Sequence, residues 1–133
     1  MIPMAHGFVF ERLEGSRVVA APAALDAARW PAGARSWRLA PDEVFVTAVV
    51  SADAVNDPHA IVEPDDGFVG VWLETRQALD FLERTCRWEL PDERPACAQG
   101  AIAGLPVKLW IDRDRVWFVV PAPYARDLEE RLS

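Results

Sequence analysis

The stretch that decides the fold spans residues 63–132 and reads EPDDGFVGVWLETRQALDFLERTCRWELPDERPACAQGAIAGLPVKLWIDRDRVWFVVPAPYARDLEERL. Its residues 68–73 are a short apolar run after a turn-forming Asp-Asp-Gly, which predicts a strand. Residues 75–86 predict a helix capped by Thr75, because one face is apolar at helical spacing. That face consists of Ala78, Leu79, Leu82 and Cys86.

The second half of this stretch predicts three strands and a helix. Residues 97–103 and 107–111 predict a hairpin around Gly104-Leu105-Pro106. Residues 116–120 predict the next strand. A final helix follows, because Tyr124, Leu128 and Leu132 recur every four residues.

The N-terminal half predicts further strands. Residues 8–13 and 17–20 read as a hairpin around Glu14-Gly15-Ser16, and residues 23–29 as a short helix. Strands are predicted at residues 36–39, 44–50 and 59–63, with a loop or helical turn over residues 51–58. Together the elements predict an α+β fold, with one mostly antiparallel sheet and helices packed on one face.

Length and composition indicate a single domain over residues 1–133. We expect an N-terminal hairpin and loop over residues 1–35 and a core over residues 36–133. The apolar fraction of 51% and the charged fraction of 26% are typical of a folded chain. A net charge of −7 argues against nucleic-acid binding. We expect a cytoplasmic protein that is not inserted in a membrane, because the sequence shows neither an apolar run of spanning length nor a signal peptide.

Candidate chemistry is weak. The cluster of His59, Glu63, Asp65 and Asp66 contains metal-ligand types, but a solvated turn explains it better. A proline-bounded loop with Glu89, Asp92 and Glu93 is better interpreted as a charged surface than as an acid–base pair. Nucleophiles would be Ser16, Ser36 or Ser51, none in a nucleophile elbow. We therefore predict no catalytic residue, no cofactor-binding residue and no metal ligand in this chain.

Six tryptophans are many for this length. They could form a core, a partner interface or a platform for a pterin or flavin ring, and we favour these in that order. Trp30 and Trp88 lie near predicted loops and are our candidates for a partner interface, together with Phe68.

The chain resembles the gamma subunit of heterotetrameric sarcosine oxidase from about residue 37 to residue 132. The resemblance depends on the order and spacing of several short motifs. These are Trp37-Arg38-Leu39-Ala40-Pro41-Asp42-Glu43, Asp66-Gly67, the predicted helix ending at Cys86, Glu89-Leu90, Ala98-Gln99, Val107 to Trp110, and the C-terminal helix. The family usually has a serine and an arginine around the glycine that precedes the predicted strand 68–73. At these positions the chain has Asp65 and Phe68. Gly100 replaces the threonine that usually follows the glutamine.

The resemblance implies the fold of the folate-binding aminomethyltransferases. It also implies a non-catalytic subunit that serves assembly in a bacterial complex oxidising sarcosine to glycine by demethylation. Larger alpha and beta flavoprotein subunits would hold FAD, FMN, NAD and tetrahydrofolate. Two alternatives remain open: a stand-alone folate- or pterin-binding protein of this fold, and a structural domain that associates with itself as a homo-oligomer.

Overall fold

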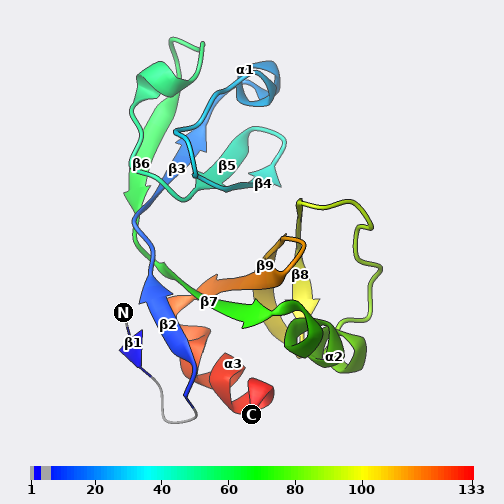
Figure 1. Cartoon of the computed structure of the whole chain (residues 1–133). Helices are drawn as coiled ribbons and strands as arrows, with labels where there is room; N and C mark the ends of the chain where they lie inside the picture. Colours follow the sequence, from blue (N-terminus) through cyan, green and yellow to red (C-terminus); the bar gives the residue numbers. More distant parts are fainter. Residues whose placement is uncertain (1, 4–6) are drawn as a thin grey trace. The chain divides into compact units, whose positions relative to one another are not determined.

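The computed structural model describes residues 2–3 and 7–133 and shows an α+β protein with two antiparallel sheets and few helices (Figure 1). The predicted α+β class is therefore confirmed, whereas the prediction of one sheet is wrong. The chain forms two compact units, Met1–Arg12 with Gly67–Ser133, and Leu13–Asp66. The predicted division between residues 35 and 36 does not coincide with either boundary of these units.

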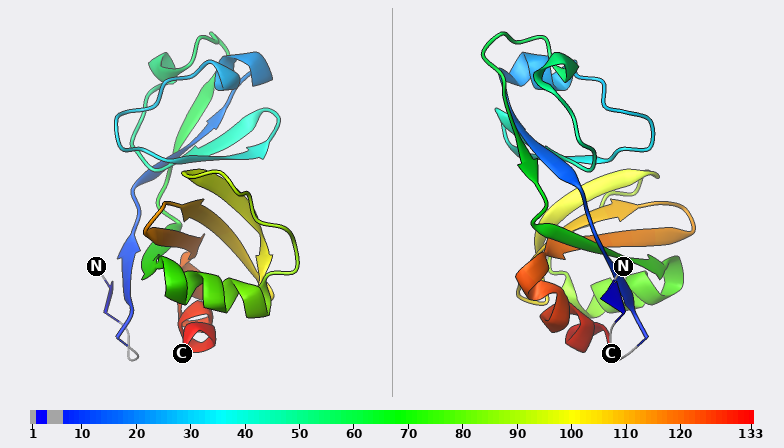
Figure 2. Two further views of the ribbon diagram at one scale, coloured as in Figure 1. Left: turned by 45° about the vertical axis from the view of Figure 1, so that its right-hand side comes forward. Right: turned by 90° about the vertical axis from the view of Figure 1, so that its left-hand side faces the viewer.

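The larger unit contains a six-stranded sheet of order β1-β2-β7-β10-β9-β8. Both of its α-helices lie on the same side of this sheet (Figure 2). The strands are β1 (Ile2–Pro3), β2 (Val9–Arg12), β7 (Phe68–Glu74), β8 (Ala96–Ile102), β9 (Leu105–Ile111) and β10 (Arg115–Pro121). The helices are α2 (Thr75–Thr85), the single 3₁₀ turn η2 (Ala122–Tyr124) and α3 (Ala125–Leu132).

One face of this sheet and the two helices form the core of the larger unit. Successive strand residues point to opposite faces, so alternate residues of each strand enter this core. Helix α2 contributes Ala78, Phe81 and Leu82, and helix α3 contributes Ala125 and Leu128. The sheet contributes Phe10, Val69, Val71, Leu73, Ile102, Leu105, Val107, Leu109, Ile111, Val116, Phe118 and Val120. Within this unit the predicted packing of helices on one face is found.

The smaller unit contains a four-stranded sheet of order β4-β5-β3-β6. Its elements are β3 (Gly15–Val19), α1 (Pro22–Asp26), β4 (Ser36–Ala40), β5 (Glu43–Val46), η1 (Ala52–Ala54) and β6 (Ile61–Asp65). Its core joins the sheet to α1 and the following loops and contains Val18, Ala20, Leu25, Val44 and Val55.

The predicted hairpin of residues 8–13 and 17–20 is wrong. Strand β2 pairs with β1 and β7, whereas β3 pairs with β5 and β6 in the other sheet. Gly15 is part of β3 and makes no turn. A Cβ atom at Gly15 would lie 2.5 Å from the ring of Phe45, so the glycine makes room for that ring. Gly15, which the sequence pattern predicts to be part of a turn, is thus needed for the packing of Phe45.

Three local predictions also change. The N-cap of α2 is Glu74 without a side-chain cap, and the Thr75 hydroxyl instead donates to the carbonyl of Arg113 at 3.4 Å. Strand β5 ends at Val46, before the end of the predicted strand 44–50. The β8–β9 hairpin is confirmed, but its turn is Ala103-Gly104, with φ angles of 53° and 78°.

Candidate interaction surface

One carboxylate of the predicted acidic cluster, Asp65, forms a structural ion pair. The Arg17 guanidinium lies 3.3 Å from Asp65 and 3.6 Å from Glu43, which is outside that cluster. Among the residues that the structure describes, no group of three or more His, Cys, Asp or Glu side chains could hold a metal ion.

Asp57 has a structural role beside this cluster. Its carboxylate accepts hydrogen bonds from the backbone amides of Ala21 at 2.8 Å and of His59 at 2.9 Å. These amides, and then the nearby His59 imidazole, hold the pKa of Asp57 below its usual value. A carboxylate with a lowered pKa is a weaker base, which argues against a catalytic role for Asp57. Its hydrogen bond to the Ala21 amide anchors the loop to the start of α1.

Ser16, one of the three serines considered and set aside as nucleophiles, has a structural role. Its hydroxyl donates to the carbonyl of Ala48 at 2.8 Å and accepts from the amide of Val50 at 3.1 Å. It is buried, and these two hydrogen bonds hold the segment that follows β5 against β3. In the loop of Glu89, Asp92 and Glu93, the Arg94 guanidinium donates to the carbonyls of Pro91 and Glu93.

Three of the tryptophans form a row on the sheet of the larger unit. Trp117 of β10 lies opposite Trp72 of β7 and Trp110 of β9 in the strand registers. The Trp72 and Trp117 rings stack with centroids 5.3 Å apart, and the Arg115 guanidinium lies 3.7 Å from the Trp72 centroid. A Cβ atom at Gly70 would lie 2.5 Å from Trp117, so this glycine receives the ring.

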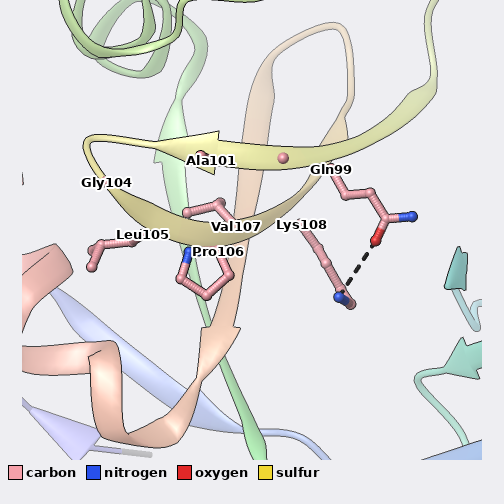
Figure 3. Close-up of a pocket in the computed structure, with 8 residues that line it drawn as sticks. Gln99, Ala101, Gly104, Leu105, Pro106, Val107 and Lys108 are labelled. Atoms are coloured by element: carbon pink, nitrogen blue, oxygen red, sulfur yellow. Dashed lines mark hydrogen bonds between the residues drawn. The ribbon is translucent and has the colours of Figure 1, made fainter.

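Phe68 lies near this row and contacts a charged side chain. The Lys108 ammonium is 5.0 Å from the centroid of the half-buried Phe68 ring. The same ammonium donates to the Gln99 side-chain oxygen at 3.5 Å across strands β8 and β9 (Figure 3). Gln99 and Lys108 line a pocket of about 370 Å³ on the β8–β9 hairpin, together with Pro106.

Trp30 belongs to the smaller unit, whereas Trp88 and Phe68 belong to the larger one. The half-buried Trp30 ring packs against the core that contains Val18, Leu25 and Val44. Trp30 therefore has a clear packing role in its own unit.

Trp88 follows helix α2 and is positioned by two hydrogen bonds. Its indole N–H donates to the carbonyl of Ala101 at 3.0 Å, and its own carbonyl accepts from the Cys86 thiol at 3.3 Å. The ring lies over Gly100 of β8, where a Cβ atom would come within 2.9 Å of it. The Ala103 amide donates to the Thr85 carbonyl at 3.4 Å, which ties the β8–β9 turn to the same helix end.

Two depressions flank the Trp88 ring. The apolar one, of about 350 Å³, is lined by Leu79, Leu82, Glu83, Cys86, Trp88 and Leu90. The other, of about 530 Å³, is lined by residues that include Arg84, Thr85, Arg87, Trp88, Ala103 and Gly104. Leu79 is 37% exposed, although the sequence predicted it on the apolar face of the helix. An aromatic ring that borders two depressions, one lined by leucines and the other by two arginines, is suited to binding another molecule.

Sequence reasoning named Trp88 but not its surroundings. Arg84 and Arg87 fall on the polar side of the helix and in the next loop, where arginine is ordinary. Gly100 was the available signal, because a glycine inside a strand often marks a close approach by another group.

The fold and surface define an α+β protein with two antiparallel sheets and, in the described residues, no helix of the length and apolarity needed to cross a membrane. No protein-family model matches this chain, and no curated protein sequence matches it.

Proposed function

We propose that this chain is a non-catalytic binding subunit that docks on a larger protein through the surface around Trp88. The observation that carries the proposal is the fixed Trp88 ring between two depressions, beside the exposed Leu79. Tryptophan is enriched among the residues that dominate binding energy at interfaces. Because hydrogen bonds already fix this ring, binding loses little side-chain freedom.

The partner that we propose is the larger part of a sarcosine-oxidase-like flavoprotein complex. The sequence resemblance to the gamma subunit supports this choice, with the motifs from Trp37 to the C-terminal helix as its basis. In this proposal the alpha and beta subunits carry the flavins, NAD and tetrahydrofolate and oxidise sarcosine to glycine. This chain serves their assembly and contributes no reacting group.

The contacts of two residues considered for chemistry in the sequence favour a binding role over a catalytic one. Asp65 pairs with Arg17, and the Ser16 hydroxyl bonds to the Ala48 carbonyl, both within the smaller unit. Each group is therefore already used for folding.

The test is recovery of the complex from native lysate with tagged wild-type chain and the variant Leu79→Gln. Glutamine keeps the helix propensity of this exposed position while removing apolar surface from the rim of the hollow. Full burial of a leucine is worth about 1.5–3 kcal/mol, and Leu79 is 37% exposed, so docking can gain about 0.6–1.1 kcal/mol from it. Because about 1.4 kcal/mol is tenfold in affinity, we expect binding to weaken about three- to sixfold. The partner should be yellow and should oxidise sarcosine or another N-methyl amine.

Ile61→Gln is the matched control, because Ile61 is 56% exposed on β6 of the smaller unit. This variant should recover as much partner as the wild-type chain. A wild-type chain that elutes alone, without flavin, would refute the proposal. Equal recovery by the Leu79 variant would show that the Trp88 surface is not the docking site.

A further inference from the structure

The larger depression beside Trp88 concentrates positive charge in an acidic chain. Arg84 and Arg87 both line it. Arg131 of α3 reaches the same turn, because its Nε–H donates to the carbonyl of Ala103 at 2.9 Å. Three arginines therefore border or contact the residues of this depression, although the net charge of the chain is −7.

These arginines are not neutralised by carboxylates. In the part of the chain that the structure describes, the ion pairs found involve Arg17 and Arg38, and none involves Arg84 or Arg87. Asp80 precedes Arg84 by four residues, a favourable spacing on a helix, yet the ion pairs found in the described residues do not include these two side chains. Arg84 instead lies 5.8 Å from the centroid of the Phe81 ring. The positive charge is thus available to a ligand.

The chemistry of the two depressions differs, and Trp88 is common to both. Arginine binds carboxylates strongly because its planar fork can donate two parallel hydrogen bonds. The neighbouring hollow offers Leu79, Leu82 and Leu90 to an apolar side chain. A free anion would fill only the basic side, whereas a peptide can present an acidic and an apolar side chain together.

We propose that the surface around Trp88 binds a segment of a partner protein in which an acidic residue neighbours an apolar one. The carboxylate pairs with Arg84 and Arg87, and the apolar side chain enters the hollow beside Leu79. This inference rests on the proposed function and specifies the chemistry of the segment that docks there.

The experiment selects binders from a displayed library of random twelve-residue peptides, using the full chain as bait at 50 mM salt. The enriched peptides should carry Asp or Glu beside Leu, Ile, Met or an aromatic residue. Their affinity should fall at least tenfold when the acidic residue becomes its amide, and also when the salt is raised to 500 mM. The indole N–H signal of Trp88 should shift on titration, assigned by its absence from Trp88→Phe.

The variant Arg84→Gln/Arg87→Gln should bind the selected peptides at least tenfold more weakly. Its matched control is Arg76→Gln/Arg126→Gln, which removes the same charge from exposed helix positions outside this depression and should change affinity less than twofold. Thermal unfolding of each variant checks that it folds. Citrate and acetate are titrated as free anions. Binding of either as tight as that of the peptides would overturn the inference.

Leu79→Gln separates the two proposals. If it abolishes selection while the Arg84/Arg87 variant does not, the binding surface stands and the carboxylate inference is wrong. If the library yields no peptide enriched over the Arg84/Arg87 variant, or if the enriched peptides lack acidic residues, the inference is also wrong. If neither variant changes the selected set, both proposals fail.

Discussion

Gly100→Ala should displace Trp88 from its place without changing any fully buried side chain of the larger unit. Gly100 lies in β8 opposite Val107, and an added Cβ atom would be 2.9 Å from two atoms of the indole and 3.1 Å from a third. Carbon atoms in contact prefer a separation of about 3.5–4.0 Å. The ring must therefore move by about 0.5–1 Å, or the strand must yield.

The cost can be worked from the contacts of the ring. Loss of the 3.0 Å hydrogen bond from the Trp88 indole to the Ala101 carbonyl costs about 1 kcal/mol. Exposure of roughly 50 Å² of the ring adds about 1.3 kcal/mol at about 25 cal/mol per Å². Replacing a strand glycine by alanine returns about 0.5–1 kcal/mol. We expect a net loss of about 1.5 kcal/mol in the free energy of unfolding.

Urea unfolding of four proteins measures this effect: wild type, Gly100→Ala, Trp88→Ala and the double variant. In the Trp88→Ala background the clash is absent, so Gly100→Ala should be neutral or stabilising by up to about 1 kcal/mol. The peptide affinity of Gly100→Ala should fall together with its stability. An equal loss of stability in both backgrounds would refute the reasoning, because the added methyl would then be strained against something other than Trp88.

Two further predictions concern stability. The amides of Ala21 and His59 lower the pKa of Asp57, so its stabilisation is present above about pH 4 and is lost as the pH falls through the lowered pKa. Asp57→Asn should be less stable than wild type in urea at pH 7, and the gap should narrow at pH 3; a constant gap would contradict this. Phe118→Ala should cost about 3–5 kcal/mol in the same assay, because Phe118 is fully buried and meets Phe81 edge to face at 5.9 Å. A loss under 1 kcal/mol would contradict the assigned core.

Elements with strong local patterns could be predicted from the sequence. The apolar run that became β7, the hairpin of β8 and β9 and the terminal helix each carry their own periodicity and turn residues. Strand pairing could not be predicted in the same way, because alternation fixes which side chains share a face and not which strand lies alongside. Gly15 shows the difficulty, because a turn and a close approach of the Phe45 ring both favour a glycine, and the sequence alone does not tell them apart.

The candidate surface was only partly predictable. A tryptophan near a loop stood out, and Trp88 was named for that reason. Arg84 did not stand out, since its spacing from Asp80 suggests an ordinary helix-surface pair, and Arg87 did not, since arginine is ordinary in a loop. Only the three-dimensional structure shows that this pair does not form and that both arginines border the hollow beside the indole.

Folding and binding share the same contacts at Trp88. The hydrogen bond to Ala101 and the bare backbone of Gly100 keep the ring in one orientation in the free chain. A partner then meets an ordered side chain and does not bear the cost of ordering it, which is about 0.5–1.5 kcal/mol for each side chain immobilised. Variants that loosen the ring should therefore weaken binding even when they leave Trp88 in the sequence. If Gly100→Ala loses binding although Trp88 is still present, then binding depends on the orientation of the ring and not only on its presence.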